Sequence, residues 1–170
     1  MNLLQVILRA VHVLGGVIWV GTMFFNTIFL LPAIRDAGPD GGKVMNALVK
    51  RGLPVFMPVV ALLTIISGSW LYWRASVGFQ PEYMRSGPGM AFGTGGVLAI
   101  LAFLVGMVTM RPMMMKMAAL GPRVAQAAAG ERDALVAEMN ALRDRLGSLG
   151  NVVLVLLVCA ALAMGIAQYM

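Results

Sequence analysis

Four long apolar stretches restrict the fold of this chain more than any other feature of its sequence. They cover residues 3–34, 52–73, 89–117 and 147–169, to within a few residues at each end. A helix crosses the hydrocarbon core of a bilayer with about 20 residues, so each stretch is long enough for one span. Only 12% of the residues are charged, whereas a soluble domain carries about twice that share. The sequence therefore predicts an all-α polytopic membrane protein in which residues 1–170 form a single four-helix transmembrane bundle.

The segment before the fourth span carries a helical pattern of its own. Its apolar residues recur at steps of four and three, as on one face of a helix. They are Leu135, Met139, Leu142, Leu146 and Leu149. We expect one long helix from about Glu131 into the membrane, packed on an extension of the third helix, with a break near Gly121-Pro122 at the turn. The third and fourth helices are thus predicted to extend into a cytoplasmic hairpin.

The basic residues predict the orientation. Ten of the thirteen lysines and arginines lie between the first and second spans, between the third and fourth, or at the end of the third span next to that second connection. Loops rich in these residues stay in the cytoplasm, so we expect both termini outside, in a bacterial inner (cytoplasmic) membrane. This bias also accounts for the net charge of +6, and we expect the lipid bilayer rather than nucleic acid as a partner.

The first apolar stretch contains the only histidine of the chain, in the run RAVHVLGGVIWVGTMFFN. Arg9, His12, Gly16 and Trp19 follow one another at steps of three and four, so they share one helix face, and Gly15 borders it. His12 lies about 13 Å along the helix from its outer end, inside the hydrocarbon. An ionisable group at this depth normally faces the bundle interior or a cavity.

Three roles can explain His12. It can ligate a metal or haem iron as a neutral imidazole, relay a proton, or form one hydrogen bond between helices. Gly15 and Gly16 leave a flat face for a porphyrin, and the Arg9 guanidinium suits a haem propionate. The same glycines also suit close helix packing, Arg9 can reach the lipid head groups, and Trp19 can be a core residue. The residues alone leave these alternatives open.

The first helix also resembles a known family. HVLGGVIWVGTMFFN followed by LLPAIR resembles the opening helix of the CopD-like (copper-resistance D) integral membrane superfamily. Arg51, Pro54, Ser67 and Gly68 match the Arg-x-x-Pro entry and Ser-Gly exit of its second helix, and RPMMMKMAALGPRVAQAAAG resembles a later region. Similar first helices occur in bacterial membrane protoporphyrinogen oxidases and in the membrane part of a haem-containing urate oxidase. The resemblance implies that His12 is an axial ligand of b-type haem.

The first functional hypothesis is therefore a haem b protein that acts in electron transfer or as a subunit of a membrane redox complex. One histidine per chain leaves the second axial position open. A methionine from the outer half can fill it, namely Met84, Met90 or Met164. The position can also stay free for a small ligand, or His12 from each chain of a homodimer can bind one shared haem through the Gly15-Gly16 face.

Two alternatives remain. Copper handling is suggested by the fifteen methionines, because thioethers favour Cu(I). Four of them are spaced as a stripe on the third helix: Met107, Met110, Met114 and Met117. Methionine is also an adaptable packing residue, so the stripe can equally be structural. The last alternative is a cofactor-free scaffold or assembly subunit. No acidic residue lies inside a span and no catalytic motif is present, so whether the chain is an enzyme stays open and any chemistry must come from a cofactor.

Overall fold

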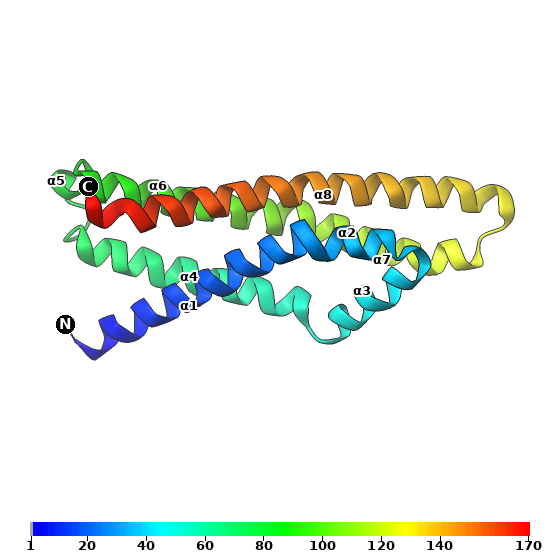
Figure 1. Ribbon diagram of the computed structural model, residues 1–170, viewed down its shortest axis with the longest axis horizontal. Coiled ribbons are helices and arrows are strands. Elements are labelled where there is room, and N and C mark those ends of the chain that lie inside the picture. Colours follow the sequence, from blue (N-terminus) through cyan, green and yellow to red (C-terminus); the bar gives the residue numbers. More distant parts are fainter. Residues whose placement is uncertain (1) are drawn as a thin grey trace.

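The protein is described by a computed structural model that covers residues 2–170, without the side chains of Pro39 and Ala129 (Figure 1). Met1, included in the predicted domain, lies outside the described residues. Within them every regular element is helical and no strand occurs. Four helices are long and apolar enough to cross a membrane, namely Leu3–Asp36, Leu53–Ala75, Gly87–Gln126 and Gly130–Tyr169. The prediction of an all-α chain with four apolar helices of spanning length is confirmed.

The first half of the chain contains two of the four long helices and the short elements that connect them. Its elements are α1 (Leu3–Phe25), the π-helical segment η1 (Asn26–Leu30), α2 (Leu31–Asp36), the short 3-10 segment η2 (Gly38–Asp40), α3 (Gly41–Lys50) and α4 (Leu53–Ala75). The first three are continuous and make the first long helix. Gly52 has a φ of 83°, which glycine adopts without steric cost, and it allows the turn from α3 into α4.

The second half contains the two longest helices. Its elements are α5 (Pro81–Met84), α6 (Gly87–Leu104), the π-helical segment η3 (Val105–Met110), α7 (Arg111–Gln126), α8 (Ala129–Ile166) and the 3-10 segment η4 (Ala167–Tyr169). The expected break at Gly121-Pro122 is wrong, because α7 continues through both residues to Gln126. Pro122 removes the N–H that would pair with the carbonyl of Ala118, but Ala118 is exposed, so that carbonyl is open to solvent.

Each π-helical segment lies just before a proline. The N–H of Leu31 donates to the carbonyl of Asn26, five residues back, and Pro32 follows. The same bond joins Arg111 to Gly106, and Pro112 follows. A proline has no N–H to donate and its ring clashes with the carbonyl four residues earlier. A wider turn before the proline is one way in which a helix relieves that clash.

The helices pack as two pairs. α1 packs mainly on α4, and α6 packs mainly on α8, while contacts of α4 with α6 and of α1 with α8 join the pairs. The buried residues between them are Trp19, Val60, Ala61, Ala102, Val153 and Leu157. Both termini and α5 lie at one end of the molecule, and the turn between α7 and α8 lies at the other (Figure 1).

The helices α7 and α8 pack on each other toward this second end. Leu120 of α7 and Leu135 and Leu146 of α8 are buried. An ion pair between Lys116 Nζ and Glu138 Oε1, 2.7 Å apart, also joins the two helices. Two members of the predicted stripe of the residue 131–149 segment, Leu135 and Leu146, are therefore buried, and α7 and α8 contact each other.

Candidate functional site

Two places where the first helix meets a neighbouring helix hold polar groups, and they differ in how tightly they are packed. The first, which we call the His12 contact, joins α1 to α4 and consists of His12, Gly15, Thr64 and Gly68. The second, which we call the Arg35 cleft, separates the first helix from α8. Its lining residues are Thr27, Leu31, Pro32, Arg35, Asp36, Asp144, Gly147, Ser148 and Asn151.

The imidazole of His12 is oriented by a backbone carbonyl of α4. Its Nδ1 lies 2.8 Å from the carbonyl oxygen of Thr64, which also accepts a hydrogen bond of 3.1 Å from Ser67 Oγ. A carbonyl oxygen only accepts hydrogen bonds, so Nδ1 carries a proton. In the neutral ring Nε2 then holds the free lone pair, which is the form that binds a metal.

Two glycines allow α1 and α4 to approach at this point. A Cβ atom on Gly68 would lie 2.5 Å from Cε1 and 2.8 Å from Nδ1 of His12, so the imidazole rests directly on this glycine. A Cβ atom on Gly15 would collide with Oγ1 of Thr64. That hydroxyl donates a 2.8 Å hydrogen bond to the carbonyl of Val60. Gly15 is therefore used for packing inside the chain.

Gly16 and Arg9 lie on the other side of His12. An α-helix turns by about 100° per residue, which places Gly15 on one side of His12 and both Arg9 and Gly16 on the opposite side. A Cβ atom on Gly16 would meet no atom within 4 Å, and Arg9 is exposed. The N-terminal part of α1 crosses α4 and lies away from α8 (Figure 1). We call this side of α1, defined by Arg9 and Gly16, the open flank.

The remaining predicted residues are distributed elsewhere. Trp19 is buried in the core, two turns from His12. Of the methionine stripe, Met110 packs on the core, whereas Met114 is 38% exposed. Met107 and Met117, the other two members of the stripe, are half-buried. Among residues 2–170 no group of three or more His, Cys, Asp or Glu side chains is placed to hold a metal ion.

The three methionines considered as second haem ligands do not gather at His12. A Cβ atom on Gly95 of α6 would lie 2.7 Å from Cγ of Met164, so this methionine packs between α8 and α6. Met84 belongs to α5 and Met90 to α6, and both are exposed. Packing on α6 therefore already occupies the Met164 side chain.

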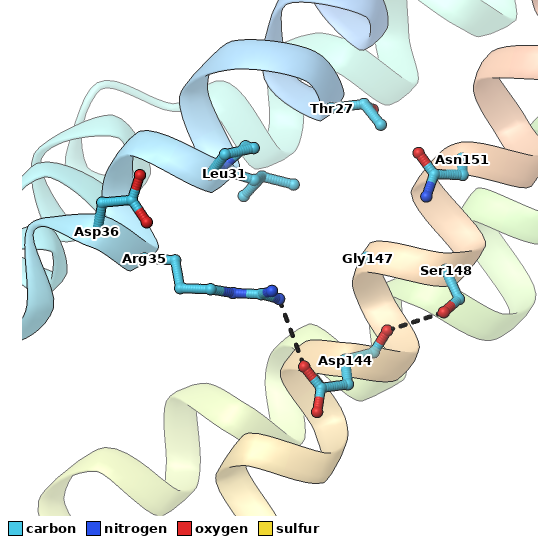
Figure 2. A pocket seen from close by; sticks show the side chains of 9 residues that line it. Thr27, Leu31, Arg35, Asp36, Asp144, Gly147, Ser148 and Asn151 are labelled. Carbon is cyan, nitrogen blue, oxygen red and sulfur yellow. Dashed lines mark hydrogen bonds and ion pairs between the residues drawn. The ribbon is translucent and has the colours of Figure 1, made fainter.

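The Arg35 cleft is a cavity of about 460 Å³ that the sequence did not reveal (Figure 2). The side chain of Arg35 extends from α2 toward Asp144 on α8, with 3.4 Å between Nη2 and Oδ1. The two side chains are 67% and 75% exposed, so the ion pair is weak. Asp144, Ser148 and Asn151 are spaced as one polar helix face, which is the signal that marks this wall in the sequence.

One hydroxyl of the cleft is buried without a partner. Thr27 Oγ1 forms no hydrogen bond within residues 2–170. It lies against α8, where a Cβ atom on Gly150 would be 3.6 Å away. An unpaired buried hydroxyl is unfavourable, and in native proteins most such groups have a protein, water or ligand partner.

An apolar groove begins where the cleft ends. It has a volume of about 290 Å³ and is lined by Asn151, Val152, Val155 and Leu156 of α8. Asn151 belongs to both cavities, so the polar cleft and the apolar groove adjoin at this residue.

Comparison with known proteins finds no match for this chain. The sequence matches no family model and no curated protein, and the structure matches no solved structure. A functional inference therefore depends on the two sites themselves and on the resemblance of the first helix.

Proposed function

We propose that this chain is an integral membrane protein that binds b-type haem through His12 and acts in electron transfer or as a haem-bearing subunit of a membrane redox complex. The observation that carries the proposal is the hydrogen bond from His12 Nδ1 to the Thr64 carbonyl. A metal-ligating histidine usually donates its other ring N–H to a carbonyl or carboxylate, which fixes the ring and its tautomer. The resemblance to the CopD-like superfamily points to the same residue.

The open flank is the place that suits the porphyrin. A Cβ atom on Gly16 would meet no atom within 4 Å, and Arg9, one turn from His12, has no ion-pair partner within residues 2–170. Its guanidinium can form a bidentate hydrogen bond with a propionate. The bound haem would supply one-electron chemistry, while the chain would orient the imidazole and balance the propionate charge.

The orientation of the chain is part of the proposal. The positive-inside rule supports a bacterial inner membrane with both termini outside and the α7–α8 hairpin in the cytoplasm. His12 would then lie in the outer half of the bilayer, with Arg9 toward the outer head groups. Labelling of single cysteines placed at residues 121–145 tests this, because an impermeant reagent should reach them only from the cytoplasmic side.

We further propose that two chains share one haem. Met164 packs on α6, which favours a second His12 over a methionine as the sixth ligand. Since Gly15 packs on Thr64, the contact between two first helices would use the Gly16 side of the expected Gly15-Gly16 face. A different partner subunit can supply the second histidine instead. One haem per two chains and a dimeric mass in detergent are expected, and a monomer with one haem would contradict the shared site.

The test of haem binding is the absorption spectrum of the protein purified from cells supplied with haem. The wild-type chain should show a Soret band, and His12→Ala should abolish it while leaving the helix content unchanged. Thr94→Val is the control, because Thr94 is exposed on α6 and lies outside the His12 contact, so this variant should keep the haem. Haem bound normally by His12→Ala would contradict the proposal.

Substitutions of Arg9 test the contact with the propionate. Arg9→Leu should weaken haem retention or shift the midpoint potential, whereas Arg9→Lys keeps the charge without the fork and should be intermediate. Arg74→Leu, at the end of α4, is a control with the same loss of charge. If Arg9→Leu leaves both properties unchanged, Arg9 serves only to reach the lipid head groups.

A cofactor-free scaffold or assembly subunit is the second candidate, and one observation favours it. The bond between His12 and Thr64 is already a complete hydrogen bond between two helices, which is the role that a polar side chain in a membrane bundle often has. In that case the purified protein shows no Soret band, metal analysis finds neither iron nor copper, and His12→Ala changes only stability. Copper without iron in the same analysis would favour copper handling instead.

A further inference from the structure

The Arg35 cleft has no role in haem binding, and its chemistry suggests a different ligand. We infer that the cleft binds the head group of a phospholipid with a primary ammonium, phosphatidylethanolamine, and that the adjoining groove holds the start of an acyl chain. The inference does not depend on the proposed function, because the cleft shares no residue with the His12 contact or the open flank.

The cleft is lined mainly by polar residues and the adjoining groove mainly by apolar residues, which matches the head group and the acyl chain of a lipid. Along α8 the lining changes from Asp144 and Ser148 to Val152 and Val155 within three turns, with Asn151 at the boundary. Thr27 and Leu31 form the opposite wall of the cleft on the first helix. The boundary between polar and apolar lining is where a head group meets its chains. A small polar metabolite would leave the apolar groove unused.

The charges of the cleft match a zwitterionic head group. Arg35 offers a guanidinium to a phosphate, and Asp36 and Asp144 offer carboxylates to an ammonium. The present bond between Arg35 and Asp144 is long at 3.4 Å and highly exposed, so a ligand can replace it at little cost. Figure 2 shows the guanidinium of Arg35 lying across the space between α2 and α8, where it can turn to a phosphate.

The buried hydroxyl of Thr27 gives the site a further group. The hydroxyl of Ser148 already donates to the carbonyl of Asp144, but Thr27 Oγ1 has no partner within residues 2–170. That oxygen is buried against α8, so it would reach a phosphate or ester oxygen of the lipid only after the Thr27 side chain turns toward the cleft that it lines. A ligand bound in this way would satisfy a group that the protein leaves unpaired.

The lining also discriminates between lipids. Choline has no N–H to donate, and its quaternary ammonium is usually bound by aromatic rings, none of which lines the cleft. The anionic lipid phosphatidylglycerol would place its charge beside two carboxylates and one arginine, which is unfavourable. Ethanolamine, with three N–H donors, suits Asp36 and Asp144.

The experiment measures lipid binding to the purified, delipidated full-length chain by native mass spectrometry and by the shift of its thermal unfolding. The probes are phosphatidylethanolamine, phosphatidylcholine, phosphatidylglycerol and the water-soluble head group glycerophosphoethanolamine. We expect saturable binding of phosphatidylethanolamine at least about tenfold tighter than binding of the other three, the effect of one charge-assisted hydrogen bond.

Two variants locate the site. Asp144→Asn removes one carboxylate and should reduce the preference for phosphatidylethanolamine over phosphatidylcholine by about tenfold. Arg35→Gln should weaken both lipids by a similar factor, because both carry the phosphate. Asp133→Asn and Arg132→Gln are matched controls, since both residues are exposed on α8 and neither lines the cleft. These controls should bind as the wild-type chain does.

Four results would overturn the inference. They are equal binding of phosphatidylcholine, tighter binding of phosphatidylglycerol, binding of glycerophosphoethanolamine as tight as that of the whole lipid, and no effect of Asp144→Asn. The third would assign the cleft to a free metabolite, and the first two would remove the head-group selectivity. All of these outcomes leave the haem proposal untouched, because that is measured at a separate site.

Discussion

The His12 contact and the Arg35 cleft are two parts of the first helix that meet their neighbours in opposite ways. In both, a threonine faces a glycine of the opposing helix, Thr64 against Gly15 and Thr27 against Gly150. The hydroxyl of Thr64 is bonded to the carbonyl of Val60, whereas that of Thr27 has no partner within residues 2–170. The first helix is therefore closely packed on α4 at His12, whereas the Arg35 cleft separates part of its C-terminal half from α8.

The reason for the difference lies in the local helix geometry and in the charges. Around His12 the helices are regular and small residues face each other, so the backbones approach and the polar groups pair. Around Thr27 the first helix is π-helical before Pro32, and the charged residues Arg35 and Asp144 line the cleft. A bundle can thus seal one contact and keep another accessible along the same helix.

The largest expected change in the free energy of unfolding comes from adding a side chain at a glycine of the His12 contact. Gly68→Leu should lower the free energy of unfolding by about 1–3 kcal/mol or more, because the added side chain collides with the imidazole of His12. Gly21→Leu, at a glycine of α1 where an added Cβ would meet no atom within 4 Å, should not lower it. Unfolding in mixed micelles measures both. Equal effects of the two substitutions would show that α1 and α4 do not meet here.

A double-mutant cycle tests the contact between Gly15 and Thr64 directly. Gly15→Ala should destabilise the wild-type chain, because its Cβ meets Oγ1 of Thr64. In a Thr64→Ala background the same change should cost at least about 0.5 kcal/mol less, since the colliding atom is gone. Additive effects would place Gly15 away from Thr64.

Replacing Thr27 or Thr64 by valine should change the free energy of unfolding by a smaller amount, and in opposite directions. In delipidated protein Thr27→Val should stabilise the fold by about 1 kcal/mol, because it removes a buried hydroxyl that has no partner. Thr64→Val should destabilise it by up to about 1 kcal/mol, because it removes a formed hydrogen bond. The measurement is again unfolding in mixed micelles. A loss of stability in both variants would mean that Thr27 is bonded in solution.

The smallest effect is expected outside both regions, in α5. Burial raises the pKa of Tyr83 above its ordinary value of 10.0, and negative charge on the nearby Tyr72 raises it further. The neutral phenol is thus favoured in the folded chain. Its contribution to stability is complete below pH 10.0 and is lost as the pH rises through the raised pKa.

Absorbance at the phenolate band should therefore show one late-titrating tyrosine, which Tyr83→Phe removes. Tyr169→Phe, at a residue that is 82% exposed, should leave that titration in place. A Tyr83 that titrates at or below the ordinary value would contradict the burial of its ring, whose centroid lies 6.2 Å from that of Tyr72 on α4.

The sequence predicts where the long helices lie better than it predicts which neighbour each helix face contacts. Spans are set by continuous apolar length, so the four long helices agree with the predicted ranges to within about ten residues at each end when the fourth span is taken with its predicted extension from about Glu131. The turn at Ala127-Ala128 was not predictable, because neither residue has turn chemistry and the Gly121-Pro122 signal lies inside α7. Periodicity groups residues by face but does not say which neighbour covers that face.

The same limit applies to the sites. The sequence singled out His12 and both glycines, but only the packing shows that Gly15 contacts Thr64 while Gly16 stays open. The Arg35 cleft was missed because its two walls are more than 100 residues apart, as the 109-residue separation of Arg35 and Asp144 illustrates. A pattern read along one helix cannot show a cavity that forms between two.

The π-helical segment η1 also affects how the first helix can tolerate a change in length. Deleting one residue from a regular α-helix rotates everything beyond it by about 100°, which turns buried side chains toward lipid. A π turn already holds one extra residue, so a deletion within Asn26–Leu30 can be absorbed by its return to α-helix. Trp19 and Arg35 would then keep their faces. The helix therefore contains one place where its length can vary without a change in the orientation of either half.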